Sequence, residues 1–546
     1  MQFSHHNRHK LLHALAENSY DVLVIGGGIT GCGIALDAAL QGMRVALIEK
    51  NDFAFGTSSR STKLIHGGLR YLKQLEFKLV RDVGTERAVV HRNARHLVVP
   101  EKMLLPIVRH GSLGELSTSA ALLVYDLLAG VKRSEWRKML NRHDTLRAEP
   151  LLDPTRLLGG GLYYEYRTDD SRLTIEIAKK AFSLGAVLVN YLQAEKFIYE
   201  KNKICGVIAI DPFTGNEITI RATAVVNAAG PWVDLLRKKD NSLQGKRLQL
   251  TKGVHLVFPH EKLPVRQAIY FDVPDGRMIF AIPRQNITYV GTTDTVYHDD
   301  IDHPLCTEED ARYLLHAVNA MFPSVHLQIS DIISSWAGLR PLIHEDGKSP
   351  SELSRKDEVI ISANGLISIA GGKLTGYRLM AQKTVNLLRK YIAKKFNNLS
   401  TRHIKLSGSE FEDEEHFLAQ ERTLTHLAQQ TGIAPHTARE WFYRYGSNTD
   451  VLIRYVSQLT AQGTDLNTAI RHAEWLYALE HEMVMHPSDF FVRRTGKLFF
   501  DRAASLHQVH PFTQFLAQHT GIPAHQAYAM EQETLRAYHD AVRFIA

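Results

Sequence analysis

The chain contains few cysteines, and their pattern excludes several classes of protein. Only Cys32, Cys205 and Cys306 occur among the 546 residues. They form no C-x-x-C pair and are odd in number, which argues against a disulfide framework and favours a reducing compartment. They also supply no ligand set for a metal ion, so we expect no metal site.

Long apolar runs are also missing. No segment reaches the roughly 18 consecutive apolar residues that a membrane-spanning helix requires. The first ten residues, MQFSHHNRHK, are polar and lack the apolar centre of a signal peptide. We therefore expect a cytoplasmic protein whose contact with a membrane is peripheral. No basic patch with interleaved aromatic residues indicates nucleic acid.

The residues that are abundant are typical of a soluble globular protein. Apolar residues make up 44% of the composition. A chain of 546 residues is too long to fold around a single hydrophobic core, so we expect two or three domains. The net charge of +7 suits an acidic substrate or an anionic membrane surface without choosing between them. The basic stretch 131–142 has two interpretations, contact with anionic lipid or a solvated helix packed through Trp136.

A phosphate-binding turn is predicted near the N-terminus. An apolar strand at 20–25 runs into Gly26, Gly28 and Gly31, which fit G-x-G-x-x-G, and a helical pattern follows. The three glycines allow the tight turn, the approach of a pyrophosphate and close helix–strand packing. Glu49 ends the next strand, 44–48, where it can accept hydrogen bonds from an adenosine ribose. This turn alone does not separate FAD from NAD.

A second turn of this kind lies at 361–381, ISANGLISIAGGKLTGYRLMA. A short apolar strand ends at Gly371 and Gly372, and Lys373 stands at the start of the next predicted helix. Free N–H groups at a helix start favour negative charge, so the pattern predicts an anion site.

The segment 56–80 is rich in small hydroxyl residues and glycine. Ser59 and Ser61 precede the step His66-Gly67-Gly68. Such residues suit a loop that lies along a cofactor, because their hydroxyl and N–H groups are free to bond it.

These segments resemble the FAD-dependent glycerol-3-phosphate dehydrogenases, a flavin family that feeds electrons to quinone. The similarity covers 25–42, where Gln41 replaces the usual arginine, and all of 371–381. It extends to 58–72, to NAAGPWVD at 227–234 and to WAGLRPL at 336–342. The resemblance implies FAD as cofactor. It implies the following cofactor-binding residues: Gly26, Gly28, Gly31, Glu49, Ser59, Ser61, His66, Gly67, Gly68, Gly230, Gly371, Gly372, Leu374 and Thr375.

The resemblance also implies the reaction. The family oxidises sn-glycerol 3-phosphate to dihydroxyacetone phosphate by hydride transfer to flavin N5, and passes the electrons to membrane quinone. The cations expected to bind the phosphate are Arg340, Arg355 and Lys373, because such groups bind phosphate oxygens well. Arg70 and Tyr71 also fall on family positions that bind substrate.

The general base has more than one candidate. His66 and His255 could each take the hydroxyl proton, because imidazole titrates near neutral pH. Lys373 could instead stabilise the developing alkoxide while it binds phosphate. The helix start after Lys373 could also stabilise negative charge on the pyrimidine edge of reduced flavin.

The expected fold is α/β. Apolar strands recur at 186–190, 205–210 and 223–228, whereas short strands between about 250 and 295 predict an antiparallel meander. We expect a doubly wound FAD-binding domain (18–100, 165–250 and 330–392) of the glutathione-reductase or amino-acid-oxidase type. An antiparallel β substrate domain (101–164 and 251–329) and an α-helical C-terminal cap (400–546) complete the chain.

Three alternatives stay open. The chain could be a glycerol-3-phosphate oxidase that uses O₂, a flavin amine oxidase of the same fold, or a flavin-binding protein without turnover. The main interpretation further predicts peripheral association with the inner face of the cell membrane, through its anionic surface. It also allows a homodimer.

Overall fold

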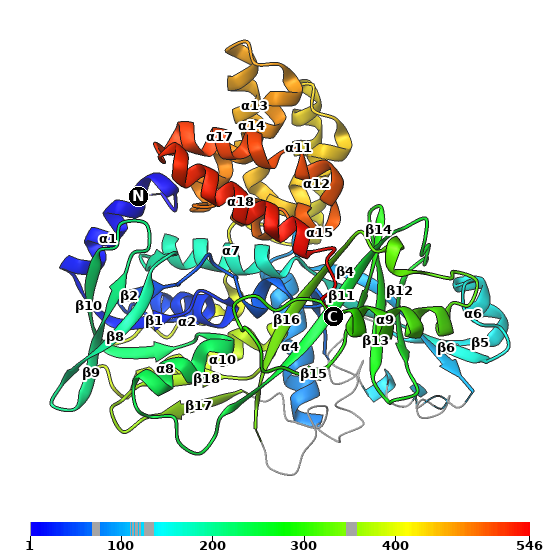
Figure 1. Ribbon diagram of the computed structural model, residues 1–546, viewed down its shortest axis with the longest axis horizontal. Helices are drawn as coiled ribbons and strands as arrows, with labels where there is room; N and C mark the ends of the chain where they lie inside the picture. The colour runs from blue at the N-terminus through cyan, green and yellow to red at the C-terminus, as the bar shows by residue number, and fades with distance from the viewer. Residues whose placement is uncertain are drawn as a thin grey trace.

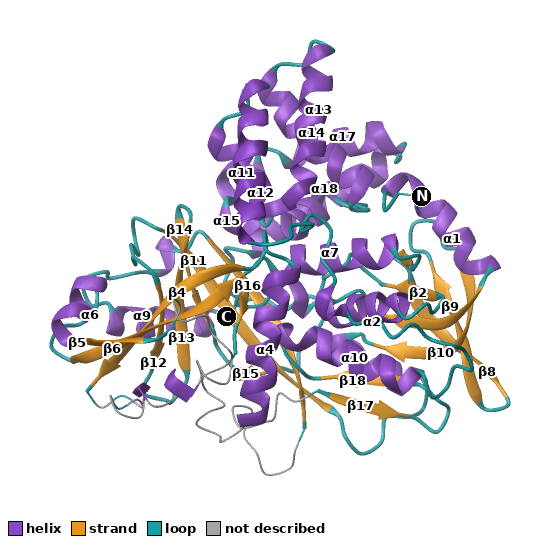
Figure 2. Ribbon diagram, turned by 180° about the vertical axis from the view of Figure 1, so that it is seen from behind, coloured by secondary structure: helices purple, strands orange, loops and turns teal. Residues whose placement is uncertain are grey.

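The computed structural model describes residues 2–67, 77–109, 111, 114, 118–119, 122–124, 136–344 and 357–545. In this part of the chain, helices and strands form three regions (Figure 1). A first mixed sheet with its helices lies beside a second, largely antiparallel sheet, and C-terminal helices, coloured yellow to red, sit above both. Figure 2 shows the strands in these two groups and the C-terminal region as helix only.

The first sheet has the order β17-β18-β10-β1-β2-β7, with the hairpin β8–β9 attached to β10. Strands β1, β2, β7, β10 and β18 run parallel, as buried apolar strands joined by helices do. The strands are β1 Ser19–Ile25, β2 Val45–Ile48, β7 Val187–Val189, β8 Gln193–Glu200, β9 Lys203–Ile210, β10 Glu217–Asn227, β17 Glu358–Ile361 and β18 Ile367–Ala370. The strands predicted at 186–190, 205–210 and 223–228 are therefore present.

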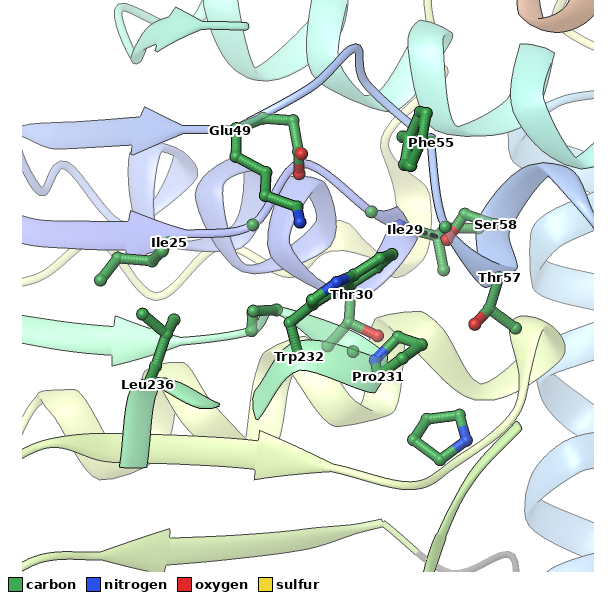
Figure 3. Close-up of a pocket in the computed structure, with 18 of the residues that line it drawn as sticks. Ile25, Ile29, Thr30, Glu49, Phe55, Thr57, Ser58, Pro231, Trp232 and Leu236 are labelled. Atoms are coloured by element: carbon green, nitrogen blue, oxygen red, sulfur yellow. Dashed lines mark hydrogen bonds between the residues drawn. The ribbon is translucent and has the colours of Figure 1, made fainter. Parts of the chain in front are cut away.

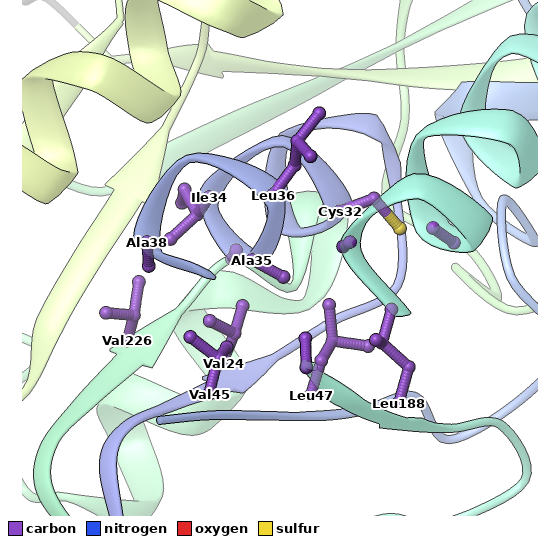
Figure 4. Close-up of a cluster of buried hydrophobic side chains, with 14 of the residues drawn as sticks. Val24, Cys32, Ile34, Ala35, Leu36, Ala38, Val45, Leu47, Leu188 and Val226 are labelled. Carbon is purple, nitrogen blue, oxygen red and sulfur yellow. The ribbon is translucent and has the colours of Figure 1, made fainter. Parts of the chain in front are cut away.

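Helix α2 (Ile29–Leu40) covers this sheet and is apolar on nearly every side. It packs against β1 and β2 and lies between α7 (Asp170–Ser183) and α10 (Tyr377–Leu388). Figure 4 shows Ile34 and Ala35 of α2 meeting Val24, Val45 and Val226 of the strands. Burial on all sides fixes α2 rigidly, so the glycine turn that precedes it has one defined position.

The second sheet has the order β15-β11-β14-β13-β12-β4-β6-β3, with β16 on β11 and β5 on β6. Its core, β11 to β14, is antiparallel, as the meander at 250–295 predicts. The strands are β3 Leu64–Ile65, β4 Val99–Val108, β5 Lys138–Asn141, β6 Leu157–Arg167, β11 Leu248–Pro259, β12 Ala268–Asp272, β13 Met278–Arg284, β14 Ile287–Gly291, β15 Thr295–Val296 and β16 Ser334–Ile343.

For two segments, the observed strand pairing in the second sheet differs from what the sequence predicts. The interpretation of 131–142 as one helix is wrong at its C-terminal end, because residues 138–141 form β5 and pair with β6. Strand β16 pairs with β11 over its whole length, although 330–392 was expected to belong with the FAD-binding domain. The hydrogen-bonded register places residues 334–343 in the second sheet. The division into domains otherwise stays a prediction.

Helices make up the C-terminal region. They are α11 Glu414–Gln430, α12 Pro435–Tyr445, α13 Thr449–Ala461, α14 Leu466–His481, α15 Lys497–Phe500, α16 Arg502–Leu506, α17 Val509–Thr520 and α18 Ala524–Asp540. The remaining helices are α1 Arg8–Glu17 and α8 Val233–Lys239, which pack against the first sheet, and α4 Phe77–Asn93, α6 Arg142–Ala148 and α9 Glu308–Met321. Phe490, Phe499 and Phe512 join Tyr289 and Trp336 in one buried cluster, so this region is packed onto the second sheet.

Candidate active site

The site begins at the turn between β1 and α2. Gly26 has φ of +115°, and a Cβ there would lie 2.5 Å from the carbonyl oxygen of Ala228. A Cβ on Gly31 would lie 1.9 Å from the carbonyl oxygen of Gly26, so the helix can approach the strand only with glycine at this position. The turn therefore has the close packing that the motif predicts, and the α2 N-terminus is left facing a cavity.

Glu49 lies at the end of β2, across this turn. Its Oε2 accepts a hydrogen bond from the Gly27 N–H at 2.6 Å, and its Oε1 accepts one from the Asn51 N–H at 2.9 Å. Burial raises the pKa of the Glu49 carboxyl. The carboxylate both holds the turn and lines the cavity, where it can face a ribose.

The cavity runs along the first sheet between Glu49 and the turn after β18. Figure 3 shows Glu49, Thr30, Ser58, Pro231 and Trp232 around it. The predicted cofactor residues that line it are Gly26, Gly28, Glu49, Ser61, Gly230, Gly371, Gly372 and Leu374, and Lys373 lines it too.

The other predicted cofactor residues play different parts. Gly31 acts through packing, and Ser59 is buried, with its hydroxyl 3.4 Å from the carbonyl oxygen of Phe55. Thr375 joins His66: the His66 N–H donates to Thr375 Oγ1 at 3.1 Å, and that hydroxyl donates to the His66 carbonyl at 3.2 Å. Gly67 does not line the cavity. Gly68 lies outside the described residues.

Ser58, Trp232 and Lys50 are among the lining residues that the sequence analysis did not single out. Ser58 Oγ accepts a hydrogen bond from the Ile29 N–H at 2.9 Å, so it caps the α2 N-terminus beside the cavity. Trp232 Nε1 donates to Asp302 Oδ1 at 2.8 Å, and Lys50 Nζ lies 2.5 Å from the same oxygen. Trp232 stands in the segment 227–234 that carries the resemblance, so that signal was available. Ser58 lies in the hydroxyl-rich stretch 58–72 that also carries the resemblance, whereas Lys50 had no separate signal.

The turn at 371–374 has the backbone that a close approach requires. Gly371 and Gly372 have φ of +77° and +82°, a region that favours glycine. Lys373 is extended, and a 3₁₀ turn, η6 (Leu374–Gly376), leads directly into α10. A helical start therefore follows Lys373, as predicted, and it borders the same cavity as the α2 N-terminus.

This cavity fits FAD. Two helix starts supply N–H groups for the pyrophosphate and the flavin edge, Glu49 is available for a ribose, and glycines leave room for backbone contact. A Cβ on Gly230 would meet no atom within 4 Å, so the backbone there is open to a ligand.

His255 lies inside β11. Its ring stacks on Trp336 with centroids 4.7 Å apart, and Nε2 is 3.0 Å from Thr62 Oγ1. Burial, and then the charge of Arg340, hold the pKa of His255 well below its usual value. The imidazole is therefore neutral, and its buried Nδ1 has no hydrogen-bond partner in the described part of the protein.

Arg340 lies in β16 at the position paired with Thr251 of β11, four residues from the His255 register. Its Nη2 donates to Thr292 Oγ1 at 2.8 Å, and Nη1 lies 3.0 Å from Asp294 Oδ1. A Cβ on Gly253 would lie 2.3 Å from Nη2, so glycine makes room for the guanidinium. The structure thus brings His255 and Arg340 close together, and holds the arginine in one orientation.

The remaining predicted substrate residues, Arg70, Tyr71 and Arg355, lie outside the described residues. Among those described, no group of three or more histidine, cysteine, aspartate or glutamate side chains could hold a metal ion. No described helix has the length and apolar character needed to cross a membrane.

Comparison with known proteins identifies the family. Residues 21–378 match the family model described as FAD dependent oxidoreductase, and 399–527 match the C-terminal domain of alpha-glycerophosphate oxidase. Aerobic glycerol-3-phosphate dehydrogenase of Bacillus subtilis (strain 168) is 51% identical over 505 residues, 92% of this chain and 91% of that protein. The chain belongs to the aerobic glycerol-3-phosphate dehydrogenase family of FAD-dependent oxidoreductases.

Further relatives agree over nearly the full length. The protein of that name from Staphylococcus aureus (strain USA300) is 50% identical over 507 residues, 92% of this chain and 91% of its own. A crystal structure of glycerol-3-phosphate dehydrogenase from Bacillus halodurans complexed with FAD is 43% identical, with a TM-score of 0.85 and 99% of each chain covered. The family resemblance and the expected fold class are therefore confirmed.

Proposed function

We propose that this protein oxidises sn-glycerol 3-phosphate to dihydroxyacetone phosphate with FAD as its cofactor, and that membrane quinone receives the electrons. The observation that carries the proposal is the cavity bordered by two glycine turns and two helix starts, in a chain whose relatives named aerobic glycerol-3-phosphate dehydrogenase match 92% of its length. Bound FAD would supply the hydride acceptor.

The protein's own residues would bind the phosphate and move a proton. Arg340 presents a guanidinium fixed by Thr292 and Asp294, and such a fork suits two phosphate oxygens. In the tautomer whose Nε2–H donates to Thr62 Oγ1, the neutral imidazole of His255 would have a lone pair on Nδ1 for the hydroxyl proton of the substrate. Lys373 lines the cavity and can stabilise the developing alkoxide or hold the phosphate.

His66 is the weaker candidate for the base. Its backbone is tied to Thr375, and its ring lies 6.1 Å from that of Phe280, centroid to centroid. These contacts suit a residue that holds the 371–375 turn against the loop beside it. We therefore assign His66 to positioning of the cofactor side, and His255 to proton transfer.

An anaerobic titration tests the proposal. The purified yellow protein would receive sn-glycerol 3-phosphate and then a soluble quinone, while the visible flavin absorbance is followed. Bleaching by the phosphate ester but not by glycerol, then recovery on quinone, supports both substrate and acceptor. No bleaching despite bound flavin contradicts the substrate and favours an amine oxidase, which an amino-acid series would detect, or a protein without turnover.

Oxygen as acceptor is the second candidate. The match of 399–527 to the C-terminal domain of alpha-glycerophosphate oxidase favours it. The reduced protein would be mixed with air-saturated buffer and, separately, with quinone. Reoxidation by oxygen at the rate of turnover would assign an oxidase, and slow reoxidation would assign a dehydrogenase.

Peripheral binding at the inner face of the cell membrane is part of the proposal. The net charge of +7 supports attraction to an anionic surface. Flotation with phosphatidylglycerol vesicles, and its loss with phosphatidylcholine vesicles or high salt, would support this attraction. Sedimentation equilibrium of the FAD-loaded protein would test the proposed homodimer.

A further inference from the structure

A second cavity lies where the two sheets meet the C-terminal helices. It has a volume of about 740 Å³. We call it the junction cavity and define it by Arg60 and Phe55 from the loop after β2, Trp336 from β16, and Val492, Phe499 and Arg536 from the C-terminal region. It shares Lys50, Phe55 and Gln193 with the FAD cavity and includes none of His255, Arg340 and Lys373.

Most charged side chains around the junction cavity already have partners. Lys50 pairs with Asp302, and His486 Nε2 lies 3.1 Å from Glu533 Oε2. Arg493 pairs with two carboxylates that are fully buried and do not line the cavity, Asp52 and Asp489. Because these charges are compensated within the protein, they do not favour a charged ligand at their own positions.

Arg60 is different. Its guanidinium lies 5.3 Å from the ring centroid of Phe55, but its side chain makes no hydrogen bond or ion pair within the described residues. Burial and the nearby charge of Arg493 lower the pKa of Arg60 to about 10. The charge of Asp302, which also pairs with Lys50, opposes this shift only in part. An anion bound directly to the partly buried guanidinium would stabilise its charge further.

The wall beside Arg60 is aromatic. Trp336 and Phe499 lie with ring centroids 5.4 Å apart, and both line the cavity together with Phe55. The indole N–H of Trp336 donates to the Ser61 carbonyl at 3.2 Å and one ring face is stacked on His255, so the indole contributes to the cavity wall only the part of its apolar surface that these contacts leave uncovered. A cavity of several hundred Å³ that combines aromatic surface with a few polar and charged groups is typical of a small-molecule site.

We propose that the junction cavity binds a small organic anion with a planar apolar body, whose acidic group pairs with Arg60 and whose body lies against Trp336 and Phe499. This second site is separate from the proposed glycerol 3-phosphate site. Because its walls come from both sheets and the C-terminal helices, a bound ligand strengthens the contact of these helices with the loop that borders the FAD cavity.

Calorimetric titration of the FAD-loaded protein with naphthalene-2-sulfonate tests the proposal, with naphthalene-2-sulfonamide as the neutral probe of the same shape. The sulfonate is expected to bind at one site, at least about ten-fold more tightly than the sulfonamide, because a hydrogen-bonded ion pair is lost in the neutral probe. Inorganic phosphate lacks the apolar body and is expected to compete weakly.

Variants locate the site. Arg60→Gln should remove the preference for the sulfonate, and Arg60→Lys should restore part of it. Ala537→Trp fills the cavity from α18 and should weaken both probes without a change of charge. Arg402→Gln is the matched control, because Arg402 is an exposed arginine away from both cavities.

Three results would overturn the proposal: no saturable binding of the sulfonate, equal binding by wild type and Arg60→Gln, or displacement of the sulfonate by glycerol 3-phosphate. The last would assign the probe to the substrate site. If Arg60→Gln fails to fold, Ala537→Trp still decides, since unchanged affinity there excludes this cavity. Since these readouts are binding affinities, they do not depend on whether glycerol 3-phosphate is oxidised.

Discussion

Arg494 and Asp52 form a bidentate ion pair that joins the C-terminal region to the cofactor-binding loop. Arg494 Nη1 lies 2.6 Å from Asp52 Oδ2, and Nη2 lies 2.9 Å from Oδ1. Neither side chain is exposed, and the pKa of Asp52 is lowered because the charges of Arg494 and Arg493 outweigh its burial. Asp52 follows Glu49 by three residues, so this pair fixes the loop that carries the ribose-side carboxylate.

Loss of this ion pair should loosen the cofactor. Arg494→Met leaves the buried Asp52 charge undercompensated, which costs on the order of 3–5 kcal/mol for a buried pair. We expect a lower midpoint of thermal unfolding, and release of flavin, detected by its fluorescence, at or before that midpoint. The double variant Asp52→Asn/Arg494→Met should recover part of the stability. If flavin release in Arg494→Met matches wild type, the C-terminal region does not hold the cofactor loop.

Gly31 tests the packing of the first turn. In Gly31→Ala the new methyl group would overlap the Gly26 carbonyl oxygen, which is backbone and cannot move alone. We expect loss of bound flavin and destabilisation of about 1–3 kcal/mol or more, measured by flavin content and urea unfolding. Gly376→Ala is the control, because its methyl group would meet nothing within 4 Å. Equal flavin content in both variants would contradict the role given to Gly31.

Arg340 should affect substrate affinity more than turnover. Arg340→Lys keeps a charge for Asp294 but loses the fork that binds two phosphate oxygens. We expect KM for glycerol 3-phosphate to rise about ten-fold or more, with a smaller fall in kcat. Steady-state kinetics with Arg312→Lys as surface control would measure this split. An unchanged KM would remove Arg340 from the phosphate site.

Buried histidines should make the fold sensitive to acid. Burial lowers the pKa of His5 to about 4 and holds that of His96 well below its usual value. Below about pH 6.5 the unfolded chain takes up protons that the folded chain refuses, so stability is full above that pH and falls toward pH 4. Each such histidine lowers the free energy of unfolding by about 1.36 kcal/mol for every pH unit in this range.

Denaturant unfolding at several pH values from 7.5 to 4.5 checks this prediction. His96 is the sharper probe, because neither ring nitrogen has a hydrogen-bond partner in the described part of the chain. His96→Leu should flatten the loss of stability on the acid side, whereas the exposed His436→Leu should leave the slope unchanged. A parallel decline in His96→Leu and wild type would exclude His96 as a source.

The sequence predicted those parts of the site that rest on local backbone geometry. Gly26, Gly31, Gly371 and Gly372 are required by turns that a few residues define, and Glu49 follows from its place at a strand end. The antiparallel strands of 250–295 could also be predicted, since short strands and turn residues alternate there. The family resemblance supplied the cofactor.

Features that depend on contacts between segments far apart in the chain could not be predicted from local sequence patterns. The choice of Ser58 over Ser59 as the residue that faces the cavity follows from the short 3₁₀ turn η2 (Thr57–Ser59), which directs neighbouring side chains apart. The neutral state of His255 depends on Trp336 and Arg340, which reach it only through strand pairing. The junction cavity combines segments more than 400 residues apart, from 50–60 to 533–541.

The order of strands in the first sheet has a consequence for how the holoenzyme is made. Strand β10 lies between β1 and β18, so the sheet stays incomplete until residues 367–370 have left the ribosome. The last residues that line the FAD cavity, Gly371–Leu374 and Met380, follow directly. A nascent chain therefore displays its first glycine turn long before the cavity that retains flavin is complete, and cofactor loading becomes a late event of synthesis.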